Sequence, residues 1–255
     1  MKLKLVFLGT GTSQGVPIIG CNCRVCVSKD IKDQRLRSSL LVKVNSHNIL
    51  IDIGPDFRTQ MLNTNNTDID IVLITHQHRD HTAGLDDLRP IYYLNKKPII
   101  LCAENKVIES LKNDFQYIFN DFLYPGKPEI NINSIDTNPF SLYGVLFTPI
   151  RVMHHKLPIL GYRIGDMSYI TDANYIALEE KKKLLGSKVL IINSLQKERH
   201  ISHYNLEQSL KIIHELKPKK AYLTHISHNM GLYSDISKEL PSNVFLGYDG
   251  LQLEI

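Results

Sequence analysis

The sequence predicts a mixed α/β fold, because short apolar runs typical of strands alternate with segments that have helical periodicity. Ile71–Ile74 and Lys188–Ile192 have the length and β-branched content of buried strands, whereas the apolar residues of Val107–Phe119 recur at helical spacing. The chain has 255 residues, which is enough to bury a full core without staples. Because no repeat or linker divides it, we expect one domain that spans residues 1–255.

The first half of the chain is expected to contain the strands Leu3–Leu8, Leu40–Val44, Asn48–Ile53, Ile71–Ile74 and Pro98–Cys102. The same patterns predict helices over Asp56–Asn63, Leu85–Leu94 and Val107–Phe119. The stretch Tyr124–Pro139 holds three prolines and a glycine, and we expect loop and irregular strand there.

In the second half of the chain, the same patterns predict the strands Gly144–Val152, Tyr162–Ile164, Tyr169–Ile170, Lys188–Ile192, Ala221–Leu223, Asn243–Leu246 and Leu251–Leu253. Helices are expected over Ala177–Leu185 and after Asn205. Asn205 with Gln208 three residues later is typical of a helix N-terminus with a capping box, and Pro218 ends that helix.

Composition and charge indicate which binding partners and which cellular compartment to expect. The 30 Lys and Arg against 26 Asp and Glu give a net charge of +4, and no dense basic tract marks a nucleic-acid surface. No segment is apolar for long enough to span a membrane, and the apolar run after Met1 is too short for a signal peptide. We therefore expect a cytoplasmic protein without disulfides, with no membrane or nucleic-acid partner.

The most informative stretch follows the strand Ile71–Ile74 and contains His76, His78, Asp80 and His81. Imidazole and carboxylate together suit Zn, Mn or Fe. His76 and His78 project alike from an extended segment, whereas Asp80 and His81 lie beyond a bend, so two metal sites fit the spacing better than one. The alternative is a polar turn with surface histidines.

Two later strand ends carry further candidates. One histidine of the pair His154-His155 is expected to be the third ligand of the first metal, and the residues alone leave the choice open. Asp172 follows the strand Tyr169–Ile170, where a carboxylate can bridge two metals. The alternative for Asp172 is the N-cap of the next helix.

Near the C-terminus, His203 stands before a helix from which it could point into the site, with His200 as the competing candidate. His225 and His228 are three residues apart after the strand Ala221–Leu223. A paired use fits them, with His225 as the last ligand of the second metal and His228 as a ligand of a separate zinc.

That separate zinc is suggested by Cys21, Cys23 and Cys26. Three clustered thiols in a reducing compartment are typical of a closed structural zinc that needs one more ligand, such as a distant histidine. A redox or incidental cluster is the alternative. The fourth cysteine, Cys102, lies in an apolar run and is expected to fill the core.

Two further features border the expected site. The loop Gly9–Gly15 lacks the third glycine and helix of a dinucleotide site, and it lacks the Gly-Lys-Ser/Thr of a P-loop. We interpret it as a turn that carries the backbone close to the active site, with nucleotide binding as the alternative. Asp52, at a strand end, is expected to accept a hydrogen bond from a ligating imidazole.

The sequence resembles the metallo-β-lactamase-fold hydrolases, and among them the PhnP-like branch of phosphoribosyl cyclic phosphodiesterases. The shared stretches are G-T-G-T-S-Q-G-V-P, C-x-C-x-x-C, T-H-x-H-x-D-H, H-x-K-L, T-D and L-T-H-I-S-H. The resemblance implies a four-layer αββα sandwich, with a structural zinc loop at about residues 20–30. It assigns one metal to His76, His78 and His154, a second to Asp80, His81 and His225, a bridge to Asp172, and a zinc to Cys21, Cys23, Cys26 and His228.

By the same resemblance the activity is hydrolysis of a small cyclic phosphodiester such as 5-phosphoribosyl 1,2-cyclic phosphate. Two divalent ions, Mn²⁺ or Zn²⁺, would hold a bridging hydroxide as nucleophile and stabilise charge on the phosphorus group. Asp80 would act as a ligand in catalysis and His203 as proton donor. One alternative is a cyclic-nucleotide or RNA-end phosphodiesterase, and another is a metalloprotein similar to the one of pyrroloquinoline-quinone biosynthesis. The third is a binding protein that the metals stabilise and that has no catalytic activity. The sequence leaves the oligomeric state open, and a homodimer is the default for the fold family.

Overall fold

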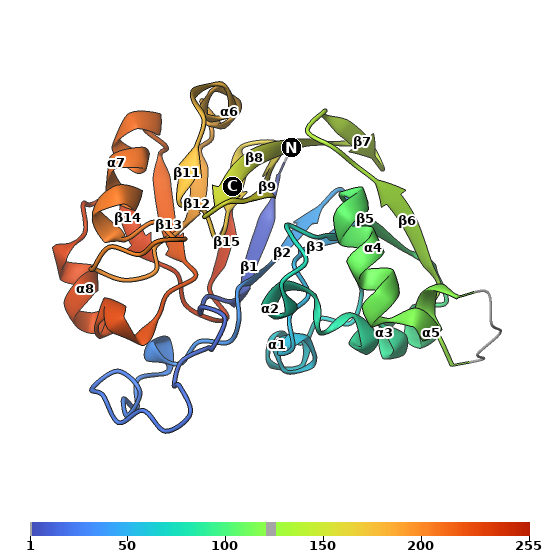
Figure 1. Cartoon of the computed structure of the whole chain (residues 1–255), viewed down its shortest axis with the longest axis horizontal. Coiled ribbons are helices and arrows are strands. Elements are labelled where there is room, and N and C mark those ends of the chain that lie inside the picture. The colour runs from blue at the N-terminus through green and yellow to red at the C-terminus, as the bar shows by residue number, and fades with distance from the viewer. Residues whose placement is uncertain (1, 121–125) are drawn as a thin grey trace.

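Two β-sheets face each other in the computed structural model of the chain, and helices cover the outer face of each sheet (Figure 1). The structure describes residues 2–120 and 126–255. The layers follow the order helix, sheet, sheet, helix. This confirms the predicted αββα sandwich.

The first sheet mixes antiparallel and parallel pairs in the order β15-β1-β2-β3-β4-β5-β6. The pairs from β15 to β3 are antiparallel, and those from β3 to β6 are parallel. Its strands are β1 (Lys4–Gly9), β2 (Ser39–Val44), β3 (His47–Ile51), β4 (Ile71–Leu73), β5 (Ile99–Ala103), β6 (Ile130–Ser134) and β15 (Gln252–Glu254).

The second sheet has the order β11-β8-β9-β10-β12-β13-β14, and β7 pairs with β8. The pairs from β10 through β12 and β13 to β14 are parallel, whereas β9 pairs antiparallel with both β8 and β10. Its strands are β7 (Phe140–Leu142), β8 (Val145–His154), β9 (Leu157–Ile164), β10 (Met167–Ile170), β11 (Tyr175–Ile176), β12 (Val189–Asn193), β13 (Lys220–Thr224) and β14 (Val244–Leu246).

Helices flank both sheets and each side has its own apolar layer. Those packed on the first sheet are α1 (Phe57–Thr64), α3 (Leu88–Asn95), α4 (Asn105–Asp114) and α5 (Gln116–Phe119). Those packed on the second are α6 (Leu178–Leu184), α7 (Leu206–Leu216) and α8 (Tyr233–Glu239). The short elements are α2 (Arg79–Thr82) and the 3₁₀ turns η1 (Ile31–Asp33), η2 (Leu85–Asp87) and η3 (His228–Met230).

The central core lies between the sheets, where side chains from both inner faces meet. Phe7 of β1 and Leu73 of β4 belong to the same buried cluster as Tyr162, Tyr169 and Ile191 of the second sheet. The two tyrosines are at most 1% exposed. Burial of these large apolar surfaces is the main force that holds the two sheets together.

The capping box predicted before α7 is present. The Asn205 side chain accepts from the Gln208 backbone N–H at 3.0 Å, and the Gln208 side chain accepts from the Asn205 N–H at 3.1 Å. The predicted helix Leu85–Leu94 is only partly α-helical, because its first three residues form the 3₁₀ turn η2.

Several described elements differ from the prediction. The short strands β7 and β11 were not predicted, and β9 begins at Leu157 and not at Tyr162. β6, α8 and β8 differ as well. β6 lies inside the proline-containing stretch expected to be irregular, of which residues 121–125 lie outside the described part. The prolines flank β6 and do not interrupt it. α8 has a single buried apolar residue, Ile236, and its stripe is too weak to detect by periodicity. β8 extends to His154, two residues beyond its predicted end.

The topology brings four separated strand ends together. His76 follows β4, His154 ends β8, Asp172 follows β10 and His225 follows β13. The first comes from one sheet and the other three come from the second sheet. No described helix is long and apolar enough to cross a membrane.

Candidate metal centre

A first cluster of potential ligands contains His76, His78 and Asp172, whose nearest ligand atoms all lie within 4.8 Å of one another. His154 adjoins it, with its ring centroid 5.2 Å from that of His78 and 5.7 Å from that of His76. By contrast, His155 is exposed and its backbone N–H donates to Asn174. Of the two adjacent histidines, the structure therefore brings His154 to the cluster.

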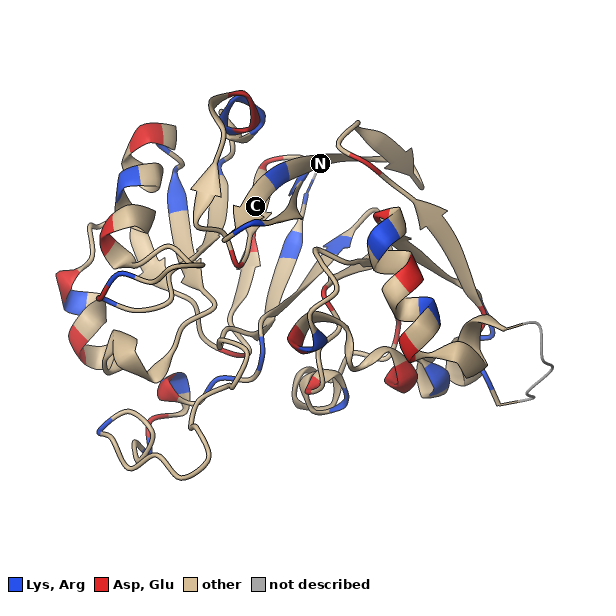
Figure 2. Ribbon diagram, in the orientation of Figure 1, with Lys and Arg blue, Asp and Glu red and all other residues tan. Residues whose placement is uncertain are grey.

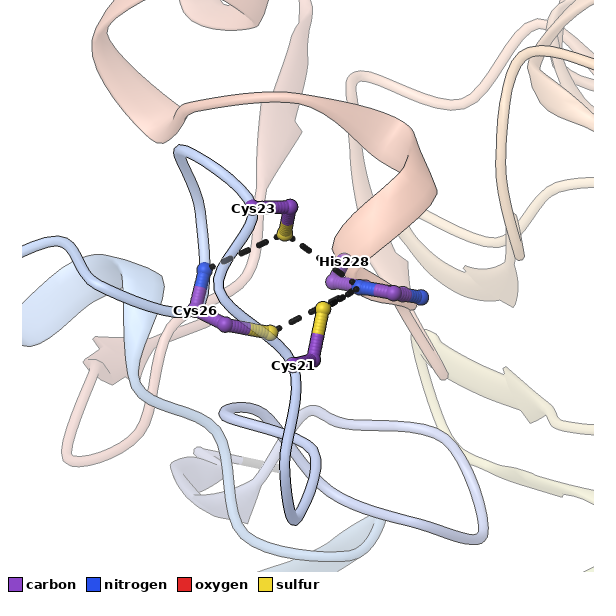
Figure 3. Close-up of side chains that lie close together, drawn as sticks. All are labelled: Cys21, Cys23, Cys26 and His228. Carbon is purple, nitrogen blue, oxygen red and sulfur yellow. Dashed lines mark hydrogen bonds between the residues drawn. The ribbon is translucent and has the colours of Figure 1, made fainter.

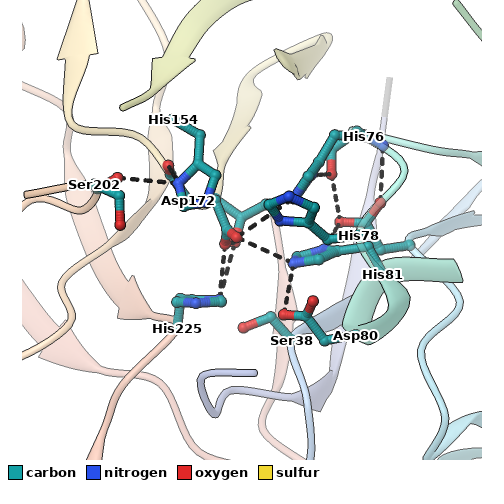
Figure 4. A network of polar contacts seen from close by, with 12 residues as sticks. Ser38, His76, His78, Asp80, His81, His154, Asp172, Ser202 and His225 are labelled. Atoms are coloured by element: carbon teal, nitrogen blue, oxygen red, sulfur yellow. Dashed lines mark hydrogen bonds and ion pairs between the residues drawn. The ribbon is translucent and has the colours of Figure 1, made fainter. Parts of the chain in front are cut away.

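A second cluster contains Asp80, His81, Asp172 and His225, again with ligand atoms within 4.8 Å. His81 Nε2 lies 3.1 Å from Asp80 Oδ2 and 3.3 Å from Asp172 Oδ2. His225 Nδ1 lies 2.8 Å from Asp172 Oδ1. Figure 4 shows these side chains converging on the Asp172 carboxylate.

Asp172 belongs to both clusters. Besides its contacts with His81 and His225, its Oδ2 lies 3.6 Å from His76 Nε2. It is not the cap of α6, because the N-cap residue of that helix is Ala177. Its backbone is left-handed, with φ 56°, a conformation that costs free energy in a residue other than glycine. A strained, buried carboxylate between two histidine clusters has the position required of a bridging ligand.

Neighbouring residues contact the histidine ring nitrogens that point away from the cluster. Asp52 accepts from His81 Nδ1 at 2.7 Å, from the Thr75 N–H at 2.8 Å and from Thr75 Oγ1 at 2.9 Å. The contact predicted for Asp52 is therefore present. Thr75 Oγ1 also lies 3.0 Å from His76 Nδ1. His154 Nδ1 donates to the carbonyl oxygen of Asp172 at 2.9 Å. Such contacts fix the orientation of an imidazole ligand.

The donor set fits divalent cations. Nε2 of His76 and of His81 is buried without a hydrogen-bond partner among the described residues. His81 Nδ1 lies 2.7 Å from Asp52 Oδ2, and its Nε2 faces carboxylate oxygens of Asp80 and Asp172. Although burial opposes the shift, the charges of Asp172, Asp80 and Asp52 raise the pKa of this imidazole well above its usual range. These carboxylates therefore favour positive charge at His81, and a bound cation would supply it in place of the proton. Burial lowers the pKa of His76 well below its usual range, which leaves this imidazole neutral as a metal ligand must be.

His203 lies beside both clusters, and His200 does not. The His203 ring centroid is 4.7 Å from that of His154 and 4.9 Å from that of His225, and the residue is 9% exposed. His200 is exposed, with its ring 5.1 Å from that of His203 on the outer side. Burial lowers the pKa of His203 to about 3, so its imidazole is neutral before a substrate binds.

A separate cluster joins the three cysteines to a histidine more than 200 residues away. His228 Nδ1 lies 3.3 Å from Cys21 Sγ, 3.3 Å from Cys23 Sγ and 3.5 Å from Cys26 Sγ. Figure 3 shows the thiols gathered around the His228 ring. The four side chains would complete a closed Cys₃His set for zinc.

The protonation of this cluster also suits a cation. The backbone N–H of Cys26 donates to Cys23 Sγ and lowers the pKa of that thiol to about 6. Burial raises the pKa of Cys26 to about 11, and neighbouring thiols add to the rise. The cluster itself therefore favours the thiolate of Cys23, and a zinc ion would displace the proton that burial keeps on Cys26.

Comparison with known proteins places the fold in one family. The family profile described as "Beta-lactamase superfamily domain" matches residues 47–226. A crystal structure of a diphosphatase from the PhnP family superposes with a TM-score of 0.94 and 37% identity, covering 100% of this chain and 98% of that one. The chain belongs to the metallo-β-lactamase-fold superfamily and to its PhnP-like branch.

Two other matches extend the comparison. A Porphyromonas gingivalis protein named octanoyltransferase is 40% identical over 253 residues, which are 98% of this chain and 51% of that protein. Zn²⁺-bound PqqB from Methylobacterium extorquens shares the fold, with a TM-score of 0.79, 19% identity and coverage of 99% and 100% of the two chains. The chain spans about half the length of the curated relatives it matches, or less.

Proposed function

We propose that the chain is a metal-dependent hydrolase of a small cyclic phosphodiester such as 5-phosphoribosyl 1,2-cyclic phosphate. The observation that carries the proposal is the placement of Asp172 between two histidine clusters, which suits a dinuclear centre. The likeness to a PhnP-family diphosphatase supports chemistry at a phosphorus–oxygen bond. In this reaction water adds across one P–O bond of the ring and leaves a phosphate monoester and a free hydroxyl.

Each residue of the centre has a proposed role. His76, His78 and His154 would hold one ion, Asp80, His81 and His225 the other, and Asp172 both. Divalent ions such as Mn²⁺ or Zn²⁺, when bound, lower the pKa of water and stabilise negative charge on phosphoryl oxygens. Asp52 orients the ring of His81, and Thr75 orients the ring of His76. In each ring the contact is made by Nδ1, so that the lone pair of Nε2 would be free to bind the ion.

His203 is proposed as the proton donor to the departing oxygen. Its ring is beside both clusters and it is neutral in the free protein, since burial lowers its pKa to about 3. An anionic phosphodiester next to this ring would raise its pKa, because an opposite charge favours the protonated form. His203 would then take up a proton as the substrate binds and donate it to the leaving alkoxide.

The cysteine cluster is proposed to hold one structural Zn²⁺, in keeping with a reducing compartment.

A small substrate is favoured over nucleic acid by the distribution of charge. Figure 2 shows Lys and Arg interspersed with Asp and Glu over both halves of the molecule. An extended basic surface would be expected for a protein that tracks a phosphate backbone.

A second candidate is hydrolysis of a diphosphate bond. The specific observation in its favour is that the 37% identical PhnP-family structure is described as a diphosphatase. The same set of ligands suits both reactions, because each places water on a phosphorus atom and expels an oxygen. The difference would lie in the groups that contact the rest of the substrate.

The test is a hydrolysis panel with Mn²⁺-loaded protein. It contains 5-phosphoribosyl 1,2-cyclic phosphate, 2′,3′- and 3′,5′-cyclic nucleotides, a nucleoside diphosphate, an RNA 3′ end and an activated aryl phosphodiester. We expect the highest kcat/KM for the cyclic ribose phosphate. Preference for the diphosphate would favour the second candidate, and preference for nucleotides or RNA would replace the proposed substrate. No turnover of any compound by protein with metals bound would contradict the proposed hydrolase.

A further inference from the structure

The glycine loop Gly9–Gly15 is held against the second metal cluster by backbone contacts. The Gly11 N–H donates to the Leu36 carbonyl at 2.7 Å, and the Thr12 N–H donates to the Ile226 carbonyl at 3.1 Å. Glycine is required at position 11, since a Cβ there would lie 2.9 Å from the carbonyl oxygens of Arg35 and Leu36. The loop is thereby fixed beside the residue after His225.

The side chain of Thr12 touches a proposed ligand. Thr12 is 8% exposed, and its Oγ1 lies 3.3 Å from His225 Nε2. The other nitrogen of that ring, Nδ1, lies 2.8 Å from Asp172 Oδ1 and faces the centre. His225 also has a left-handed backbone, with φ 54°, so its orientation is held by its surroundings and not by local preference.

The other buried histidines of the centre show the same arrangement. One ring nitrogen points at the centre and the other has a partner behind it, which is Asp52 for His81 and Thr75 for His76. His154 uses the carbonyl oxygens of Asp172 and Ser202 in this way. Thr12 supplies the corresponding partner for His225, from a loop more than 200 residues away in the sequence.

We infer that Thr12 is a positioning residue for His225. The Nε2–H of the neutral imidazole donates to Thr12 Oγ1, which leaves the Nδ1 lone pair, 3.5 Å from Thr171 Oγ1, available for the ion that Asp80 and His81 would hold. This gives the glycine loop a role in metal affinity, distinct from nucleotide binding. The inference rests on the dinuclear centre of the proposed function.

The first test is a Mn²⁺ titration by calorimetry on three variants. Thr12→Val keeps the shape and removes the hydroxyl, and we expect one of the two active-site ions to bind ~10–100-fold more weakly, the usual effect of losing such a partner. Thr12→Ser keeps the hydroxyl and should bind like wild type. Ser13→Ala, an exposed neighbour in the same loop, is the matched control and should also be unchanged.

Two outcomes of the titration would overturn the inference. One is Thr12→Val protein that binds both ions as tightly as wild type. The other is an equal loss in Thr12→Val and Thr12→Ser, which would assign the effect to packing of the methyl group and not to the hydroxyl. Wild-type protein that binds no pair of ions would overturn the dinuclear centre as well, so the two failures are distinguishable.

A second measurement does not depend on a variant that folds. A long-range ¹H–¹⁵N correlation spectrum of Zn²⁺-loaded wild-type protein reports which nitrogen of each histidine carries the proton. We expect the His225 ring to be protonated on Nε2 and bound through Nδ1, with its signals assigned by comparison with His225→Gln. A His225 ring protonated on Nδ1 would overturn the inference.

Discussion

The two candidate metal sites of this chain are built in opposite ways. The cluster around Asp172 draws potential ligands from four segments of both sheets, buries most of them, and gives several of its histidines partners such as Asp52 and Thr75. The cysteine cluster takes three ligands from one six-residue loop, adds His228, and leaves all four half-buried. A site that orients most of its histidines in advance suits catalysis, whereas a closed four-ligand site suits stability.

The two sites nevertheless meet on one segment. His225 belongs to the first and His228 to the second, and both follow β13. Between them, the Ile226 N–H donates to the Thr10 carbonyl at 2.9 Å, which ties this segment to the glycine loop. Figure 1 shows the blue N-terminal loop beside the red C-terminal segments. Zinc at the cysteine cluster would therefore steady the backbone that presents His225.

The largest effect is expected from Asp172→Asn, which weakens the ligand shared by both ions. Hydrolysis should fall to the uncatalysed rate, and metal analysis should find one zinc per chain, held by the cysteines. Steady-state kinetics and inductively coupled plasma mass spectrometry measure the two quantities. Activity within ~10-fold of wild type would contradict the bridging role.

Next in size is the effect of His203→Ala. We expect kcat to fall ~10²–10⁴-fold, the usual range for proton transfer, with both active-site ions retained. His200→Ala is the matched control, because His200 is an exposed histidine 5.1 Å from the same ring, and it should keep wild-type activity. Equal losses in the two variants would argue against His203 as the specific donor.

A smaller effect is expected from Asp52→Asn. The amide keeps the size of the side chain but loses the negative charge opposite His81, so Mn²⁺ affinity should fall ~10–100-fold. Asp70→Asn is a suitable control, since Asp70 is a buried carboxylate that pairs with Lys97 away from the centre. Calorimetric titration should show that only Asp52→Asn changes metal binding.

The smallest effect on turnover is expected from Cys23→Ser. This variant should lose the structural zinc and lower the unfolding temperature by ~5–10 °C, which corresponds to a loss of a few kcal/mol. Its kcat with added Mn²⁺ should stay close to wild type, because the backbone hydrogen bonds of Ile226 with Thr10 and Thr12 still hold the segment that carries His225. Cys102→Ala, at the buried thiol of β5, should keep the zinc. Unchanged zinc content and stability in Cys23→Ser would refute the structural site.

The residue patterns predicted most strands and the residue types of both clusters. The apolar run before His76 predicted β4, and the capping pattern at Asn205 placed α7 to within a residue. The layered architecture and the division of ligands between two ions came from the resemblance, because spacing alone does not say which distant segments meet. His154 and His155 show the limit, since only the register of β8 separates them.

The supporting contacts could not be predicted in the same way. Thr12 and His225 are separated by 213 positions, and a threonine in a glycine loop has no pattern that identifies its partner. Thr75 was also missed, although its position directly before His76 was a usable signal. α8 was missed because its apolar periodicity is weak. β6 was expected only as irregular strand, and its parallel pairing with β5 makes it regular.

The most direct test of the division between the two sites is anomalous X-ray scattering at the zinc edge from crystals of Zn²⁺-loaded protein, before and after a soak in chelator. We predict three peaks, two flanking the Asp172 carboxylate and one among Cys21, Cys23, Cys26 and His228. The soak should remove the two peaks at Asp172 first, because an open site exchanges its metal more readily than a closed one. A single peak near Asp172, or none among the cysteines, would contradict the account.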